Sequence, residues 1–207
     1  KKIIDSLDCD KCLVKIGSIA FNSIGHSVIS YAAKKGFDIF LDLKLHDIPN
    51  TVKKSIQGLS SLPINMLTIH ASGGREMMKA AMQGAEETDI KIFGVTALTS
   101  LDNNDISEIY NRSTSDQVNT MLDMADETGI HGIVCSPHEL ELVNKKNSLL
   151  SITPGIRLKD LDDDQKRTMS PKQAIELGAD YIVLGRAITT SRNIGKILKD
   201  IHSDINS

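Results

Sequence analysis

The sequence predicts an α/β domain built on a parallel sheet, and it favours a closed barrel. Seven short apolar runs recur along the 207 residues, and most are rich in Val and Ile, as buried parallel strands are. Longer stretches with spaced apolar positions separate these runs, and such alternation is typical of a parallel sheet covered by helices. We found no repeat or linker, so residues 1–207 are expected to form one domain.

The order of the expected elements follows from these runs. The expected strands are Leu13–Ile16, Ile39–Lys44, Met66–Ala71, Ile92–Leu98, Gly132–Ser136, Leu150–Ile156 and Tyr181–Arg186. The expected helices are Asn22–Lys35, Val52–Ser61, Gly74–Glu87, Ser115–Thr128, Pro137–Asn144 and Pro171–Leu177. Two of these helices begin at a Ser-Pro pair, which places a capping residue before Pro at the first helical position.

Two architectures accommodate this alternation. A doubly wound open sheet tolerates seven strands, whereas a (β/α)8 barrel needs eight strand–helix units. Residues 1–7 resemble the end of a helix, and the strand before that helix is expected to be absent from this chain. The prediction is therefore a (β/α)8 barrel without its first strand.

Composition excludes several classes of protein. The net charge of -3 argues against broad nucleic-acid binding, which needs a basic face. The sequence contains no run of about 18 apolar residues, so no membrane span is predicted. The N-terminal apolar stretch is too short for a signal peptide, so we expect a cytoplasmic protein. Cys9 and Cys12 form a Cys-x-x-Cys, but a strand follows the pair and there is no second pair for zinc, so reduced structural thiols are expected.

Charged residues gather on the second expected strand. Residues two apart on a strand face the same side, so Asp42 and Lys44 are expected to project together, with Asp47 just beyond the strand end. Neighbouring acids keep a lysine charged, and a charged lysine at the mouth of a barrel can deliver a proton. A structural ion pair that holds a loop is the alternative interpretation.

The last two expected strands suggest an anion site. Phosphate sites in barrels often form from the loops after strands seven and eight, and here these loops begin with Gly155-Ile156-Arg157 and Gly185-Arg186. Glycine allows close backbone approach, and arginine offers a fork of donors to phosphate. The alternative interpretation is that Arg157 and Arg186 are surface arginines without a ligand. His70 is interpreted as a packed histidine rather than a catalyst.

The segment 40–51, Phe-Leu-Asp-Leu-Lys-Leu-His-Asp-Ile-Pro-Asn-Thr, closely resembles the signature of orotidine 5'-phosphate decarboxylases. Six further segments fall in the order of that family: 13–17, 70–74, 95–100, 134–136, 153–157 and 182–186. Related sugar-phosphate decarboxylases and aldolases share the Asp-x-Lys-x-x-Asp core. The Ile-Pro-Asn-Thr and Pro-Gly-Ile-Arg segments favour the orotidine 5'-phosphate decarboxylases over these related enzymes. The chain is identified as a member of the bacterial type of this family.

The resemblance implies a (β/α)8 barrel that decarboxylates orotidine 5'-phosphate to UMP, the last step of pyrimidine synthesis. It implies no metal and no organic cofactor. It also implies a homodimer with active sites at the interface, in which Asp47 acts in the neighbouring subunit's site. Neither a nucleic-acid nor a membrane partner is expected.

The resemblance also implies roles for individual residues. Lys44 would protonate C6 of the pyrimidine, and Asp42 would lie beside the scissile carboxylate. Lys15 and Asp47 would contact the ribose hydroxyls, and Thr99 would contact the pyrimidine. The other expected substrate-binding residues are Thr51 and, for the phosphate, Arg157, Gln165, Gly185 and Arg186.

Two other functions remain open at this point. A metal-dependent sugar-phosphate decarboxylase or aldolase would share the barrel and the core motif but would lose activity on chelation. A non-catalytic barrel would bind UMP without releasing carbon dioxide. The family's first strand normally supplies an aspartate to the ribose, and Asp8 lies too close to Lys15 to replace it.

Overall fold

The computed structural model describes residues 1–156 and 169–206. Its sheet has seven strands, all paired in parallel and in the order of the chain. The strands are β1 (Val14–Gly17), β2 (Ile39–Leu45), β3 (Met66–His70), β4 (Lys91–Val95), β5 (Gly132–Val134), β6 (Leu150–Thr153) and β7 (Tyr181–Ile182). A doubly wound sheet reverses its strand order at a switch point, so this order excludes that alternative and confirms the barrel-type sheet.

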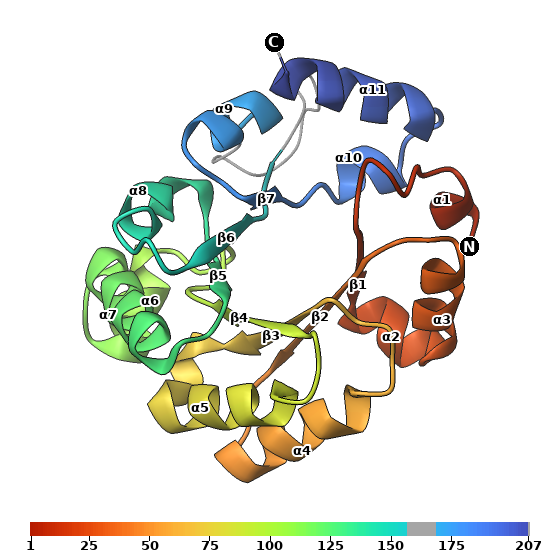
Figure 1. The fold of residues 1–207 in the computed structure, drawn as a ribbon. Coiled ribbons are helices and arrows are strands. Elements are labelled where there is room, and N and C mark those ends of the chain that lie inside the picture. The colour runs from red at the N-terminus through yellow and green to blue at the C-terminus, as the bar shows by residue number, and fades with distance from the viewer. Residues whose placement is uncertain (157–168, 207) are drawn as a thin grey trace.

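Helices surround the outside of the curled sheet (Figure 1). The helices are α1 (Lys2–Asp5), α2 (Ser18–Ile24), α3 (Ser27–Lys34), α4 (Pro49–Leu59), α5 (Gly74–Ala85), α6 (Asn103–Tyr110), α7 (Thr114–Thr128), α8 (Leu140–Val143), α9 (Pro171–Glu176), α10 (Arg186–Thr189) and α11 (Ile194–Ile205). Two short 3-10 helices, η1 (Ala71–Gly73) and η2 (Pro137–Glu139), follow β3 and β5. Within the described ranges, no helix is both long enough and apolar enough to cross a membrane.

The set of expected helices needs correction. The helix expected over 22–35 is two helices, because Gly25 ends α2 with φ at 72° and the chain restarts at α3. Helices α10 and α11 were not among the expected helices, and neither was α6. Its start is marked by Asp102, whose side chain accepts hydrogen bonds from the N–H groups of Asn104 and Asp105. Gly25 lies inside an apolar periodic stretch, which concealed the break.

The curled sheet separates two layers of apolar packing. Phe40, Met66, Phe93 and Ile152 form a small cluster of side chains from four different strands. Alternate strand residues such as Leu41, Leu67 and Ile92 join a much larger cluster together with helical residues. Because successive strand residues point to opposite faces, residues 40 and 42 share the face opposite to the helices. This alternation directs Asp42 toward the inside of the barrel.

The later strands are shorter than expected. Strands β4 to β7 end at residues 95, 134, 153 and 182, whereas the apolar runs predicted ends at 98, 136, 156 and 186. The last residues of each run leave the sheet and enter the loops at its carboxyl edge. Apolar composition alone does not distinguish a strand from the buried start of a loop. Thr99 and Gly185, two of the residues expected to bind substrate, lie in these loops.

Candidate active site

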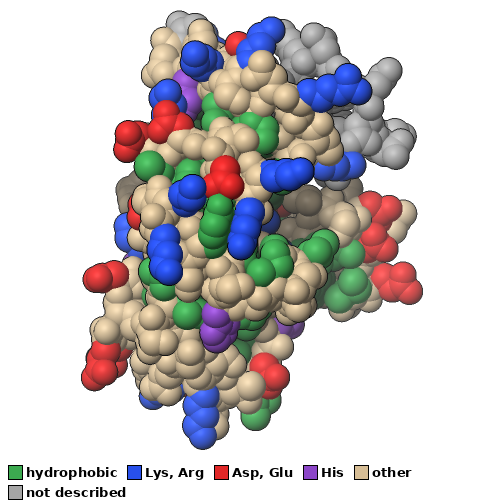
Figure 2. Space-filling view, turned by 90° about the vertical axis from the view of Figure 1, so that its right-hand side faces the viewer, with side chains coloured by type: hydrophobic (Ala, Val, Ile, Leu, Met, Phe, Trp, Pro, Cys, Tyr) green, Lys and Arg blue, Asp and Glu red, His purple; other side chains and the backbone are tan. Residues whose placement is uncertain are grey.

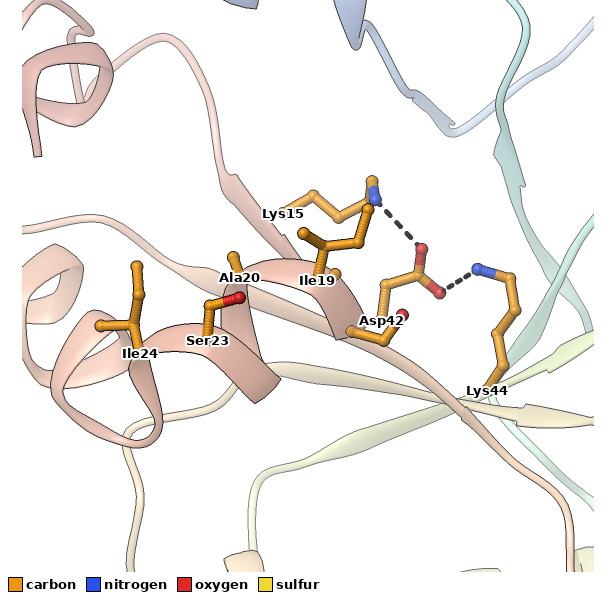
Figure 3. Close-up of a pocket in the computed structure, with 9 residues that line it drawn as sticks. Lys15, Ile19, Ala20, Ser23, Ile24, Asp42 and Lys44 are labelled. Atoms are coloured by element: carbon orange, nitrogen blue, oxygen red, sulfur yellow. Dashed lines mark hydrogen bonds and ion pairs between the residues drawn. The ribbon is translucent and has the colours of Figure 1, made fainter.

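A pocket of about 530 Å³ opens at the carboxyl ends of β1 and β2 (Figure 3). Lys15, Asp42 and Lys44 line it from the strands, and the first turns of α2 complete it. The pocket residues from the β1–α2 segment are Gly17, Ser18, Ile19, Ala20, Ser23 and Ile24. The pocket therefore lies at the edge of the sheet where barrel enzymes place their active sites.

Asp42 lies between two ammonium groups. Its Oδ1 is 2.7 Å from Nζ of Lys44, and its Oδ2 is 3.1 Å from Nζ of Lys15. The Asp42 side chain is 11% exposed, whereas both lysine side chains are 35% exposed. The carboxylate is therefore largely enclosed, and the two cations face the pocket. This arrangement confirms that Asp42 and Lys44 project together, and it adds Lys15 from the neighbouring strand.

The charges around Asp42 determine its protonation state. Burial by itself raises the pKa of Asp42, but the hydrogen bond from Lys44 and the charges of Lys15 and Lys44 outweigh burial, so its pKa lies below the usual value. Asp42 is therefore ionised at neutral pH. The ammonium of Lys44 lies 2.7 Å from this carboxylate, so the site pairs the lysine with a fixed negative charge.

The backbone of Lys44 departs from regular strand geometry. Its φ is 53°, in the left-handed region that residues other than glycine rarely adopt. Leu41 pairs with Leu67 and Leu45 pairs with Ile69, so the register between β2 and β3 shifts between these two pairs. We expected simple alternation to bring Asp42 and Lys44 together. The two side chains do meet, but through a bulge rather than through a regular pleat.

Thr68 is a site residue that sequence reasoning missed. It is fully buried on β3, and its hydroxyl donates to Oδ1 of Asp42 at 3.0 Å. The hydroxyl oxygen of Thr68 accepts the backbone N–H of Lys44 at 2.8 Å. A hydroxyl within the otherwise apolar run of β3 was the available signal. Without the register of β2 against β3, that signal did not identify a partner.

His70 also lies near the lysine. Its ring centroid is 5.2 Å from that of His46, and the two planes are tilted by 39°. Burial lowers the pKa of His70, and the nearby His46 and Lys44 lower it further. His70 is therefore held toward its neutral form, and it packs beside the site rather than adding another cation. This agrees with its interpretation as a packed histidine.

Three expected site residues lie on exposed loops or helices within this chain. Asp47 is exposed, and its Oδ1 accepts the N–H of Ile48 at 2.7 Å. Among the described residues, no ion pair joins Asp47 to Lys44. Thr51 lies exposed on α4, and Thr99 lies exposed in the loop after β4. None of the three completes the Asp42 cluster from within the same described chain.

The expected phosphate residues divide into two groups. Gly185 precedes α10 and Arg186 begins it, and both are exposed. We expected Gly185 and Arg186 to end a strand, but β7 ends at Ile182 and these two residues begin the next helix. Arg157 and Gln165 lie outside the described residues. Their contribution stays a prediction.

The three cysteines of this chain form no disulfide in the structure. Cys9, Cys12 and Cys135 are all free. Burial raises the pKa of the Cys12 thiol, which opposes thiolate chemistry at the Cys-x-x-Cys. Across residues 1–156 and 169–206, no group of three or more His, Cys, Asp or Glu side chains is placed to hold a metal ion.

Comparison with known proteins shows the family to which this chain belongs. A family model described as "Orotidine 5'-phosphate decarboxylase / HUMPS family" matches residues 1–201. This chain belongs to the orotidine 5'-phosphate decarboxylase / HUMPS family. The match spans the strands that carry Lys15, Asp42 and Lys44 and continues into α11. It confirms the family that the motifs predicted.

Relatives named orotidine 5'-phosphate decarboxylase are similar over most of their length. The one from Wolbachia pipientis is 46% identical over 184 residues, which are 87% of this chain and 81% of the relative. The one from Staphylococcus saprophyticus is 48% identical over 187 residues, 87% of this chain and 81% of the relative. This level of identity makes the chain a carboxy-lyase, as the sequence predicted.

Solved structures of the family share the fold. The orotidine 5'-phosphate decarboxylase from Lactobacillus acidophilus superposes with a TM-score of 0.86 at 34% identity, covering 100% of this chain and 92% of that one. The enzyme from Methanocaldococcus jannaschii, complexed with the inhibitor BMP, superposes with a TM-score of 0.80 at 20% identity, covering 100% and 92%. The second likeness shows the fold alone. Together they confirm the TIM-barrel architecture.

Proposed function

We propose that this chain converts orotidine 5'-phosphate to UMP and carbon dioxide without a cofactor, with Lys44 as the proton donor to C6. The observation that carries the proposal is the Asp42 carboxylate, held between the ammonium groups of Lys44 and Lys15 at 2.7 and 3.1 Å. A lysine fixed in this way is oriented before substrate arrives. The family assignment supports the substrate and the reaction.

The chemistry requires a fixed cation beside C6. When the bond between C6 and the carboxylate breaks, its electron pair stays on C6 and carbon dioxide departs. The ammonium of Lys44 stabilises this charge as it develops, and a preorganised charge needs no reorganisation during the reaction. Lys44 then transfers one proton to C6 and becomes a neutral amine, which regains a proton from water. Asp42 lies beside the departing carboxylate and orients Lys44.

Phosphate binding lies at a distance from this chemistry. Arg186 and Gly185 at the start of α10, with Arg157 and Gln165, form the proposed phosphate site. The phosphate takes no part in bond breaking, so its binding energy serves to position the pyrimidine against Lys44. Thr99 contacts the pyrimidine, and Lys15 contacts the ribose.

The proposed enzyme is a cytoplasmic homodimer whose second subunit completes the site. Ile19 and Ile24 line the pocket yet are 84% and 53% exposed, and Ile48 beside Asp47 is 67% exposed. Figure 2 shows exposed hydrophobic side chains among Lys and Arg side chains on one face of the molecule. Large apolar side chains beside a charged pocket are suited to burial by a second copy. Asp47 then acts in the neighbouring subunit's pocket.

A turnover assay tests the reaction and the donor together. Loss of the orotate absorbance on adding orotidine 5'-phosphate, resistant to EDTA, is the expected result. Lys44→Ala removes both the proton donor and the fixed charge, so kcat should fall by at least about 10³-fold. Lys79→Ala, an exposed lysine on α5, is the matched control. Loss of turnover on chelation would instead favour the metal-dependent alternative, and UMP binding without turnover would favour the non-catalytic barrel.

Subunit mixing tests the role of Asp47. Lys44→Ala and Asp47→Ala proteins are each expected to be nearly inactive. If Asp47 acts in trans, a hybrid dimer holds one site that carries both substitutions and one that carries neither. Mixing equal amounts with subunit exchange should then restore up to about a quarter of the wild-type activity. No recovery in verified hybrid dimers would overturn the proposed role in trans.

A further inference from the structure

We propose that Thr68 is a positioning residue that sets both the carboxylate of Asp42 and the backbone of Lys44. The inference rests on the proposed function, because it concerns the geometry of the proton donor. Thr68 itself touches neither the pocket nor solvent, since it is fully buried on β3 and is not among the residues that line the pocket. It acts through two neighbours on β2.

The hydrogen bonds of Thr68 belong to a closed ring that links Thr68, Asp42 and Lys44. Its hydroxyl donates to Oδ1 of Asp42 at 3.0 Å and accepts the N–H of Lys44 at 2.8 Å. The same Oδ1 accepts the ammonium of Lys44 at 2.7 Å. One hydroxyl therefore ties the lysine backbone to the carboxylate that holds the lysine side chain. Both ends of Lys44 are fixed relative to one atom of β3.

The bulge in β2 creates the need for this hydroxyl. Leu41 opposes Leu67 and Leu45 opposes Ile69, so three residues of β2 lie opposite Thr68 alone. In a regular parallel ladder, a backbone carbonyl of the neighbouring strand accepts each N–H that points toward it. At the bulge, the side-chain oxygen of Thr68 accepts the N–H of Lys44. This bond stabilises a residue whose φ of 53° lies in the left-handed region that residues other than glycine rarely adopt.

The chemistry of the hydroxyl fits both duties. A hydroxyl carries one donor and two acceptor lone pairs, so it can serve Asp42 and Lys44 at the same time. Valine has nearly the same shape but can do neither. A donor to an ionised carboxylate also favours the ionised form. The charged or titratable groups around Asp42 are Lys15 on β1, Lys44 on β2 and His70 on β3.

The test compares Thr68→Val, Thr68→Ser and Thr153→Val with wild type. Thr153 is equally buried on β6, and no hydrogen bond joins its hydroxyl to Asp42 or Lys44, so Thr153→Val is the matched control. Hydrogen bonds to charged groups predict that Thr68→Val lowers kcat about 10- to 100-fold with a smaller change in KM. The acid limb of its pH profile should move to higher pH. Thr68→Ser should retain kcat within about threefold, because it keeps the hydroxyl.

Amide hydrogen exchange provides a second readout that does not depend on turnover. The Lys44 amide should exchange faster in Thr68→Val than in wild type, while the amides of β6 are unchanged. If Thr68→Val does not fold, Thr68→Ala replaces it in both measurements. A wild-type kcat, pH profile and Lys44 exchange rate in a folded variant without the hydroxyl would overturn the inference. Equal losses in Thr68→Val and Thr153→Val would do the same, whereas an inactive wild type would contradict the proposed function instead.

Discussion

Nζ of Lys44 lies 2.7 Å from Oδ1 of Asp42, although the lysine backbone between them is in the left-handed region. The two residues are separated by one position, and the bulge brings their side chains together on the pocket side of β2. Strain of this kind persists only where surrounding contacts over-determine it. Here those contacts are the two hydrogen bonds of Thr68. The lysine is thus held in place before any ligand binds.

Asp42 should stabilise the fold in a pH-dependent way. Its pKa is lower in the folded chain than in the unfolded chain, so its contribution is present above the unfolded pKa and is lost as pH falls through the folded value. Asp42→Asn should therefore lower the free energy of unfolding by about 1–3 kcal/mol at pH 7. The difference should shrink below about pH 4. Urea denaturation at several pH values measures it.

The control for that experiment is Asp200→Asn, an exposed acid on α11. It should change the free energy of unfolding by less than about 0.5 kcal/mol at any pH. A constant difference between wild type and Asp42→Asn across the pH range would contradict the electrostatic account. It would indicate instead that the aspartate contributes through packing.

Glu139 should have the opposite effect. Its Oε2 accepts the hydroxyl of Thr96 and the N–H of Ser136, each at 3.1 Å, and burial raises its pKa. A raised carboxyl pKa stabilises the fold at low pH, and that stability is lost as pH rises through the folded value. Glu139→Gln keeps an acceptor oxygen without the charge. It should raise stability at pH 7 by about 0.5–2 kcal/mol, with little gain near pH 4.

Thermal or urea denaturation of Glu139→Gln is compared with that of Glu141→Gln, an exposed acid on α8. The control should not change stability at either pH. A loss of stability in Glu139→Gln at pH 7 would show that the ionised form of Glu139 stabilises the fold, against the direction of its pKa.

The exposed apolar side chain of Ile19 should report on assembly. Ile19 is 84% exposed, so Ile19→Asp should leave the fold of a single chain nearly unchanged. If a second copy covers it, an aspartate there should weaken the dimer by more than about tenfold. Analytical ultracentrifugation measures the dimer dissociation constant. Ile109→Asp on α6, 60% exposed and on the opposite side of the barrel in Figure 1, should leave it unchanged.

The three thiols should react at very different rates. Cys9 is exposed, whereas Cys135 is buried and burial raises its pKa to about 12. A thiol-specific reagent at pH 8 should therefore label Cys9 first and Cys12 more slowly, since burial also raises the Cys12 pKa. Cys135 should react only after unfolding. Rapid labelling of Cys135 in the folded protein would contradict its enclosure.

Local patterns predicted much of the fold. Apolar runs located all seven strands, and Ser136 and Ser170 cap the helical segments that they were expected to begin. These features depend on residues that are neighbours in the sequence, so they can be predicted from the sequence. The break at Gly25 and helix α6 were missed because apolar spacing alone does not report a left-handed glycine or a short polar helix.

The sequence by itself determined the alternation of strands and helices, the motif that carries Asp42 and Lys44, and through that motif the family. Only the tertiary structure decided that Lys15 shares the carboxylate of Asp42 and that Thr68 supports both ends of Lys44. These contacts join residues 24 to 27 positions apart. Their formation depends on the register of three strands and on a bulge in one of them, and a register is set by the packing of the whole sheet rather than by neighbouring residues.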